Sequence, residues 1–402
     1  MITIEQASEI LKKNAVHAEA EETDLTEALN HTLAGDIEAP FDLPAFNNSA
    51  MDGYAVRWRD IEAAAGGIPV EVVLTGESQA GHPFEGRLQR GQAIRISTGA
   101  VVPDSADVVV PVEDCAPADG ERVTILQAKK RHQHIRFKGE EFSKGMIVAK
   151  KGVRITPAYV ALLASIGIDR VKVAARPAVS LCITGSELVD HNNATAFGQV
   201  RNSNGPMLEG ALNRDGARLL NSHHLGDDPE KIKNALASSA LLSDLIISTG
   251  GVSVGHHDHV RSAAEAAGFE TLFWKIRQRP GKPMFAARRG NCLLIGLPGN
   301  PVSAFMGYTH YIKPLLGYMQ GQPFKRQTIV ARMAGGVINR SERVQLNRVV
   351  LEQKEGELLP TARLLSRQGS HMPTTVAHAD GYIRIKINQQ IEAGEQVAVF
   401  LF

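Results

Sequence analysis

The chain has 402 residues, of which 43% are hydrophobic and 22% are charged, and its formal net charge is +1. This length exceeds one ordinary core, so the sequence predicts a soluble globular protein of two to four domains. A net charge near zero gives no support to binding of bulk nucleic acid or of an anionic membrane surface.

Residues 1–65 predict a segment of mixed character. Helices are expected over residues 4–14 and 24–33, and Pro40 and Pro44 then interrupt regular structure. The stretch 44–56, PAFNNSAMDGYAV, is dense in small polar residues around Asp52 and Gly53. Its composition alone favours a turn over a binding site.

Short β-like runs punctuated by glycines predict a small β domain over residues 66–133. The expected strands are 70–74, 93–96, 107–112 and 122–127. The run RISTGA ends one strand in a hydroxyl-bearing turn, where Thr98 either caps the turn or contacts a ligand. Residues 134–176 return to mixed character, with a helix over 158–166. Together with residues 1–65 they predict one discontinuous α+β linker domain.

Strands and helices alternate from residue 177 to 326, which predicts a central, doubly wound and mostly parallel α/β domain. The expected strands are 178–184, 218–223, 245–248, 271–275 and 292–297. The expected helices are 206–213, 229–241, 260–267 and 301–316. Four further β-like runs, at 328–333, 344–351, 382–387 and 397–402, predict a small C-terminal β barrel or sandwich over residues 327–402.

The strongest local signal is the stretch DLIISTGGVSVGHHDHVRS at residues 244–262. An apolar strand, a loop rich in glycine and hydroxyl groups, and an amphipathic helix follow one another, as in the phosphate-binding edges of open α/β sheets. The P-loop and G-x-G-x-x-G patterns both fail here, because His256 and His257 occupy the P-loop Lys and Ser/Thr positions. The loop is therefore a different phosphate loop or a flexible turn. Its expected phosphate contacts are Gly250, Gly251, Ser253 and Gly255.

Polar motifs follow all five strands of the central domain, which predicts a site at one edge of its sheet. The motifs are residues 184–187, 227–229, 250–255, 275–282 and 297–301. The carboxylates of Glu187, Asp227 and Asp258 suit Mg²⁺, which binds a few carboxylates together with substrate phosphates. Asp258 is equally suited to cap the following helix. Zinc is disfavoured, because no paired cysteines accompany the nearby histidines.

The segment 275–282 is basic. In an extended chain Lys275, Arg277 and Arg279 would project to the same side, with Lys282 one turn later. Such clustering suits phosphate recognition, although a solvated strand face would carry the same residues.

Two general features predict a cytoplasmic location. Residues 1–14 have no apolar signal-peptide region, and no run approaches the 18 apolar residues of a membrane-spanning helix. The three cysteines, at positions 115, 182 and 292, are isolated, as expected of reduced thiols without a metal.

Seven segments resemble the molybdopterin molybdenumtransferase family, the type of bacterial MoeA and of the eukaryotic gephyrin E domain. They are PAFNNSAMDGYAV, RISTGAVVP, TGSELV, RNSNGPML, STGGVSVGHHD, PGKP and LPGNPVSAF, in the family's order. The resemblance implies an elongated four-part protomer with a central domain like that of the molybdopterin adenylyltransferase MogA. It also implies a homodimer with shared active sites, and Mg²⁺-dependent insertion of molybdate into adenylylated molybdopterin with release of AMP. The adenylyltransferase that makes this substrate is a candidate partner, whereas nucleic acid and membranes are not expected partners.

The resemblance assigns functional positions one by one. They are Asp52, Thr98, Glu187, Asp227, Asp258, Lys275, Lys282, Pro298, Pro301 and Ser370. The chain departs from the usual pattern at Asn47, where Asp is common, at Arg279, where Lys is common, and at Asp380, where Asn is common. Arg279 keeps the positive charge, whereas Asp380 adds a negative charge near the expected anion site.

We expect the pyrophosphate-linked substrate to lie across the sheet edge, held by Lys275, Arg279, Lys282 and the loop N–H groups. Molybdate, a tetrahedral dianion, needs a second set of N–H and hydroxyl donors. The candidates are Pro298, Asn300, Pro301, Ser303 and Ser370.

Two other functions fit the central domain. An adenylyltransferase or hydrolase is disfavoured, because it would need only that domain and not the flanking residues 1–175 and 327–402. A non-catalytic scaffold is disfavoured, because it would need none of the carboxylates at positions 52, 187, 227 and 258.

Overall fold

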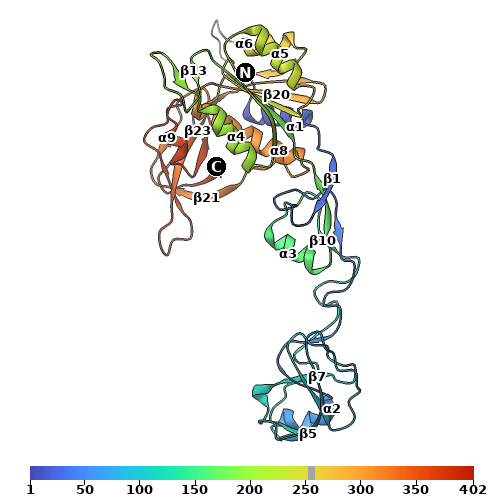
Figure 1. Ribbon diagram of the computed structural model, residues 1–402. Helices are drawn as coiled ribbons and strands as arrows, with labels where there is room; N and C mark the ends of the chain where they lie inside the picture. The colour runs from blue at the N-terminus through green and yellow to red at the C-terminus, as the bar shows by residue number, and fades with distance from the viewer. Residues whose placement is uncertain (252–258) are drawn as a thin grey trace. The chain divides into compact units, whose positions relative to one another are not determined.

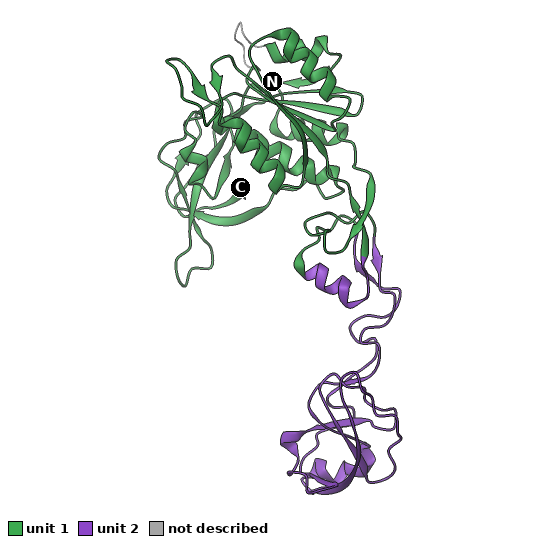
Figure 2. Cartoon of the chain, viewed as in Figure 1, with its two compact units in different colours: residues 1–35, 151–157, 170–402 green, residues 36–150, 158–169 purple. Residues whose placement is uncertain are grey.

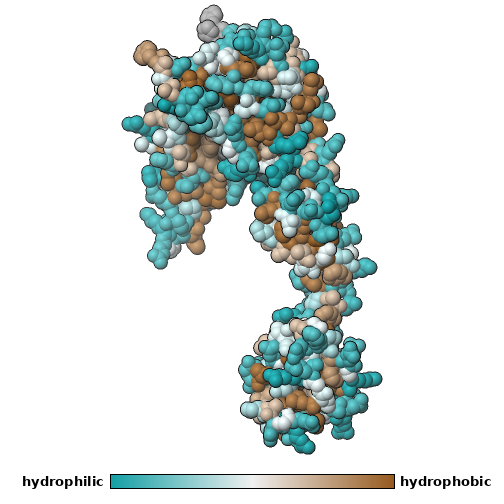
Figure 3. All heavy atoms as spheres, in the orientation of Figure 1, coloured by the Kyte–Doolittle hydropathy of each residue, from teal (hydrophilic) through white to brown (hydrophobic). Residues whose placement is uncertain are grey.

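The computed structural model describes residues 1–251 and 259–402 (Figure 1). The chain forms two compact units (Figure 2). Unit 1 comprises residues 1–35, 151–157 and 170–402, and unit 2 comprises residues 36–150 and 158–169. On the face that Figure 3 shows, hydrophilic and hydrophobic residues are interspersed over each unit. Within the described ranges, no helix has both the length and the apolar character needed to cross a bilayer.

Unit 1 contains a six-stranded sheet with the order β15-β12-β16-β20-β19-β17. Its strands are β12 (Ala178–Thr184), β15 (Arg218–Leu225), β16 (Leu245–Thr249), β17 (Glu270–Trp274), β19 (Phe285–Arg289) and β20 (Cys292–Leu297). The first three and β20 pair in parallel. The strand β19 was not predicted from the sequence, and it pairs antiparallel with both β20 and β17. Consequently β17 runs in the same direction as β20.

Helices cover both faces of this sheet, because successive residues of its central strands are apolar and project to opposite faces. Leu181 and Ile247 belong to a core cluster with residues of α1 (Ile4–Asn14), α4 (Asn204–Arg214), α7 (Pro301–Gly307) and α8 (Lys313–Met319). Cys182 and Ile246, one position along each strand, pack instead with α5 (Pro229–Ser239) and α6 (His259–Ala266). Figure 1 shows α5 and α6 together, apart from α4 and α8. The predicted doubly wound domain is confirmed.

A closed β barrel forms the C-terminal part of unit 1. Its strands are β21 (Thr328–Met333), β23 (Val344–Glu352), β24 (Thr361–Leu364), β25 (Gly381–Ile385) and β27 (Gln396–Leu401). They are ordered β23-β24-β21-β27-β25, and a β23–β25 pairing closes the ring. The short strand β18 (Gln278–Arg279) pairs in parallel with β23, so the basic segment is joined directly to the barrel. This barrel confirms the expected C-terminal β fold.

Unit 2 is built on a five-stranded sheet with the order β7-β4-β6-β5-β8. The strands are β4 (Gly53–Val56), β5 (Val70–Ser78), β6 (Gln92–Ile96), β7 (Val108–Pro111) and β8 (Arg122–Ile125). A side chain at Gly53 would place its Cβ 2.0 Å from the Val110 carbonyl oxygen, so only glycine fits there. The division of the whole chain into four domains remains a prediction.

The remaining elements are short. They comprise α2 (Trp58–Ile61), α3 (Pro157–Ser165), α9 (Thr374–Ala377) and the strand pairs β1 (Ala20–Asp24) with β11 (Arg170–Ala174), β2 (Ile37–Glu38) with β10 (Ile147–Ala149), β3 (Asn48–Ser49) with β9 (Ile135–Arg136), β13 (Leu188–Val189) with β14 (Val200–Arg201), and β22 (Val337–Ile338) with β26 (Gln390–Ile391).

Two predicted helices differ from the structure. The helix expected over residues 24–33 is wrong: the chain turns after β1, and Leu33 bridges Val173 instead. The helix expected over 301–316 is interrupted by a π-helical turn, Tyr308–Ile312, between α7 and α8. Pro314 follows this turn and has no N–H for an i→i−4 bond, which accounts for the wider turn.

Candidate functional site

Five polar loops meet at one edge of the unit 1 sheet. They follow β12, β15, β16, β17 and β20, which all run in the same direction and therefore end at the same edge. A cavity of about 680 Å³ lies at this edge. Its lining includes six of the predicted site residues, namely Glu187, Gly250, Gly251, Pro298, Asn300 and Pro301. The structure thus brings together residues from three of the five loops.

Close packing at the strand ends requires glycine at positions 250 and 251. Both have positive φ, 84° and 58°, which L side chains rarely adopt. A Cβ at Gly250 would lie 2.3 Å from the Thr184 carbonyl oxygen, so β12 and β16 could not approach as they do. The other predicted contacts of this loop, Ser253, Gly255 and Asp258, lie outside the described residues. Phosphate binding by the loop remains a prediction.

Two adjacent aspartates at the end of β15 have different partners. Asp227 accepts a hydrogen bond from the Ser186 N–H at 3.1 Å, and its own N–H donates to Ser186 Oγ at 2.9 Å. These bonds fix the Asp227 carboxylate beside the loop that follows β12. Asp228 instead caps α5, accepting from the N–H groups of Glu230 and Lys231 at 3.1 and 3.2 Å. Only Asp227 is therefore available to a ligand without loss of a helix cap.

The predicted Mg²⁺ ligands fit hard-oxygen coordination, but their assembly is not visible in the described part of the chain. There, no three His, Cys, Asp or Glu side chains lie together as a metal site requires. The third predicted ligand, Asp258, is outside that part. Glu187 lines the cavity, and its carboxylate is turned back against Gly185. The metal site remains a prediction.

The start of α7 is joined to the C-terminal barrel region by Ser370. Asn300 donates from Nδ2 to Ser370 Oγ at 3.3 Å, and the Val302 N–H donates to the Ser370 carbonyl at 3.2 Å. Because the Asn300 side chain is used in this way, it makes no capping bond to α7. Ser303, also predicted to contact substrate, is 3% exposed and does not line the cavity.

The predicted basic strand face is wrong in one respect. Lys275 has φ 70°, and the flanking backbone is held by Ile2, which accepts from Arg277 and donates to Lys275. Lys275, Arg277 and Arg279 therefore do not share a regular extended segment. The Lys275 ammonium lies 3.5 Å from the centre of the Trp274 ring. Lys282 and Arg279 are exposed at the surface beside this segment.

Two polar residues that the sequence reasoning missed are buried near this region. Arg348 is 1% exposed; its Nη2 donates to the Gly369 carbonyl and to Thr375 Oγ1, both at 3.3 Å, and its Nε has no partner. Burial, and then the nearby charge of Arg279, lower the Arg348 pKa to about 10. The sequence holds one sign of this burial: Arg348 is two positions after Leu346 in a strand, so both side chains project to the same, apolar side.

Asn204 lines the cavity. It donates to the Gly299 carbonyl at 2.8 Å and has an unpaired Oδ1.

Asp52 and Thr98 belong to unit 2. Thr98 donates to the Asp52 carboxylate from both its N–H and its hydroxyl. The structure thus pairs two predicted site residues from separate sequence motifs. Both side chains are exposed.

Three family models match the chain in order. The MoeA N-terminal region (domain I and II) matches residues 2–167, the probable molybdopterin binding domain matches 180–318, and the MoeA C-terminal region (domain IV) matches 330–402. Together they cover most of the chain.

Individual relatives agree with these models. The chain is 35% identical to the molybdopterin molybdenumtransferase of Haemophilus influenzae, over 80% of this chain and 78% of that protein. It is 36% identical to the Staphylococcus epidermidis protein of the same name, over 80% and 76%. A crystal structure of a molybdopterin biosynthesis MoeA protein from Pyrococcus horikoshii superposes with a TM-score of 0.86 at 26% identity, covering 100% of both chains. The chain therefore belongs to the MoeA family.

Proposed function

We propose that this chain is a molybdopterin molybdenumtransferase, which inserts molybdate into adenylylated molybdopterin and releases AMP with the molybdenum cofactor. The observation that carries the proposal is the cavity of about 680 Å³, which joins the carboxyl edge of the sheet to the Ser370 loop. This volume is in the range of small-molecule sites. The cavity is also lined by Gly250 and Gly251, which let a phosphate approach the backbone, and by the unpaired amide oxygen of Asn204, which can accept a hydrogen bond from an N–H or O–H group of the ligand.

The residues of the edge divide by charge. Lys275, Arg279 and Lys282 are proposed to bind the substrate's phosphates, and Gly250 and Gly251 let the phosphates approach the backbone closely. Glu187 and Asp227, with Asp258, are proposed to hold Mg²⁺. A metal ion bound there would supply positive charge beside the leaving phosphate. Asp227 suits this role because Ser186 already orients its carboxylate.

Arg348 and Arg279 support a place for molybdate next to Ser370. A buried guanidinium without a nearby carboxylate is costly, and a second cation beside it increases the cost. Within the described residues, no carboxylate lies within 4.0 Å of either guanidinium. A tetrahedral dianion bound beside these groups, with the Ser370 hydroxyl as a further donor, would offset both charges. Asn300 positions Ser370 through its side-chain amide.

We also propose a cytoplasmic homodimer with shared active sites. The resemblance of their motifs to the family implies that Asp52 and Thr98 are site residues, yet they belong to unit 2, whereas the cavity lies within unit 1. A second copy of the chain is the proposed means of completing each site. The adenylyltransferase that supplies the substrate is the proposed transient partner.

The deciding experiment supplies the purified chain with adenylylated molybdopterin, with and without molybdate. Release of AMP and formation of active cofactor, detected by reconstitution of a cofactor-free molybdoenzyme, are both expected only when molybdate is present. Consumption of the substrate at the same rate without molybdate would favour a hydrolase or adenylyltransferase. No consumption under either condition would favour a scaffold.

A further inference from the structure

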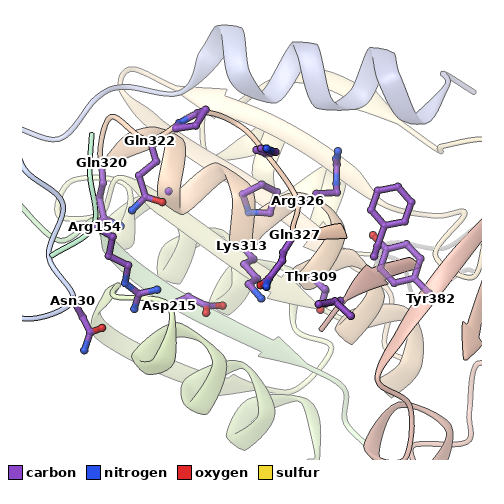
Figure 4. A pocket seen from close by; sticks show the side chains of 16 residues that line it. Asn30, Arg154, Asp215, Thr309, Lys313, Gln320, Gln322, Arg326, Gln327 and Tyr382 are labelled. Carbon is purple, nitrogen blue, oxygen red and sulfur yellow. The ribbon is translucent and has the colours of Figure 1, made fainter. Parts of the chain in front are cut away.

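A second cavity, of about 160 Å³, lies in unit 1 and shares no lining residue with the cavity at the sheet edge. Figure 4 shows its side chains, which come from three parts of unit 1. Asn30 lies near the N-terminus, and Arg154 lies in the segment 151–157, which pairs with it; these two segments are called the N-terminal part here. Lys313 begins α8, and Tyr382 belongs to the barrel.

The charge of this cavity is unbalanced. Four cations line it, namely Arg154, Lys313, Lys325 and Arg326, against the single carboxylate of Asp215. That carboxylate is already engaged, because it accepts from Arg214 Nε and Nη2, each at 2.9 Å, and from the Tyr308 hydroxyl at 3.0 Å. No carboxylate of the described residues lies within 4.0 Å of any of the four cations.

Two of these cations are partly removed from water. Burial lowers the pKa of Lys313, and burial likewise lowers the pKa of Arg326. Arg326 donates from Nε to the His310 carbonyl at 2.8 Å and from Nη2 to Ser8 Oγ at 2.9 Å, so its charge is fixed beside neutral acceptors. Positive charge held in this way is costly without an anion.

An unpaired hydroxyl points to the same conclusion. Thr309 lines the cavity, is 4% exposed, and has no hydrogen-bond partner at Oγ1. Buried hydroxyl groups are normally bonded to protein, water or ligand. The cavity therefore combines a neutral donor with surplus positive charge, which is the complement of an oxyanion.

We propose that this cavity binds a free tetrahedral oxyanion of the phosphate class, separate from the substrate phosphates at the sheet edge. Its volume is several times the roughly 30 Å³ that one water occupies, which suits one phosphate ion with a few waters and excludes a nucleotide. The bound anion joins the N-terminal part, α8 and the barrel. It therefore stabilises the folded chain by mass action.

The test is thermal unfolding of the full chain in a titration of inorganic phosphate, with potassium chloride adjusted to keep the ionic strength constant. A saturable rise in melting temperature is expected. Lys313→Gln and Arg154→Gln should each raise the phosphate dissociation constant at least tenfold. Thr309→Val, which keeps the volume and removes the hydroxyl, should raise it severalfold.

Two matched substitutions separate this cavity from other sites. Arg279→Gln weakens the proposed anion site at the sheet edge, so the phosphate stabilisation that remains in this variant reports the present cavity. Lys130→Gln removes an exposed cation of unit 2 and should not change the dissociation constant more than twofold. AMP should not replace phosphate in the Arg279→Gln variant, because the cavity is too small for it.

Three outcomes would overturn the proposal. An equal rise in melting temperature with chloride in place of phosphate would mean that salt only screens the repulsion between the cations. Loss of the effect in Arg279→Gln with retention in Arg154→Gln would place the anion at the sheet edge. If neither Thr309→Val nor Arg154→Gln changes the phosphate dissociation constant, the cavity holds water and does not bind the anion. Because the Arg154 side chain is exposed, we expect Arg154→Gln to fold, so this variant tests phosphate binding even if Lys313→Gln does not fold.

Discussion

Asp52 Oδ1 accepts two hydrogen bonds from Thr98, one from its N–H at 2.7 Å and one from its hydroxyl at 3.1 Å. The two residues are 46 positions apart in the sequence. Strand register brings them together, since Gly53 at the start of β4 pairs with Ile96 at the end of β6. Thr98 therefore holds the Asp52 carboxylate in one orientation on the surface of unit 2.

If Asp52 completes an active site in a second copy of the chain, inactive variants should complement one another. We expect an equal mixture of Asp52→Ala and Asp227→Ala chains, unfolded and refolded together, to recover about a quarter of wild-type activity, because half of the dimers are mixed and each has one intact site. Each variant refolded alone provides the baseline. Absence of recovery in verified mixed dimers would exclude shared sites.

The neighbouring residues Asp227 and Asp228 provide a matched pair. Asp228→Ala removes a helix cap and should lower the free energy of unfolding by about 1 kcal/mol while leaving turnover within about twofold. Asp227→Ala should abolish turnover with a smaller effect on stability. Urea unfolding and turnover measured on the same preparations distinguish them. The opposite pattern would remove Asp227 from the proposed metal site.

Neutralisation of the basic segment should weaken substrate binding. Lys282→Gln and Lys275→Gln should each cost roughly 1.5–3 kcal/mol, or about ten- to over a hundredfold in affinity for adenylylated molybdopterin. Arg277→Gln, an exposed cation two positions from Lys275, is the control and should have little effect. Calorimetry at two salt concentrations measures the affinity of each variant for adenylylated molybdopterin. Equal losses in all three variants would indicate general charge attraction rather than specific contacts.

His310 makes stability depend on pH. It is fully buried, its Nδ1 is bonded to the Tyr382 hydroxyl, and burial lowers its pKa well below 6.5. The unfolded chain therefore binds one more proton than the folded chain below about pH 6.5, and stability falls as the pH decreases through that value.

The expected slope from His310 is up to about 1.4 kcal/mol per pH unit. Urea unfolding between pH 8 and 5.5 measures it. His310→Gln should reduce the slope without abolishing it, because the pKa of His31 is also lowered by burial. An unchanged slope in this variant would show that other groups control the acid response. His17→Gln, with an exposed imidazole, is the control.

The central domain could be predicted because its signals are local. Leu245, Ile246 and Ile247 form an unbroken apolar run, which is typical of a strand buried on both faces. The polar residues after each strand then follow from the rule that ligands bind at the carboxyl ends. Asp228 and Pro229 mark the start of a helix in the same local way.

The rest depends on contacts between distant parts of the chain. Residues 24–33 contain helix-forming residues, but pairing with residues 153–155 and 172–173 holds them in irregular backbone. The left-handed Lys275 follows from its contact with Ile2, which no local pattern reveals. Arg348 gains its significance only from the barrel that buries it. The bond between Asn300 and Ser370 likewise requires the barrel and α7 to meet.

The chain leaves unit 1 after residue 35 and returns at residue 151, yet the backbone segments on either side of this excursion lie next to each other. Leu33 accepts a hydrogen bond from the Gly152 N–H at 2.8 Å and donates one to the Val153 carbonyl at 2.9 Å. The second excursion, over residues 158–169, returns at Arg170, which pairs with Asp24. Unit 2 thus has the architecture of an inserted domain, whose entry and exit points are adjacent in unit 1. Such a domain can be gained, exchanged or lost in evolution without a change in the connections of the host fold.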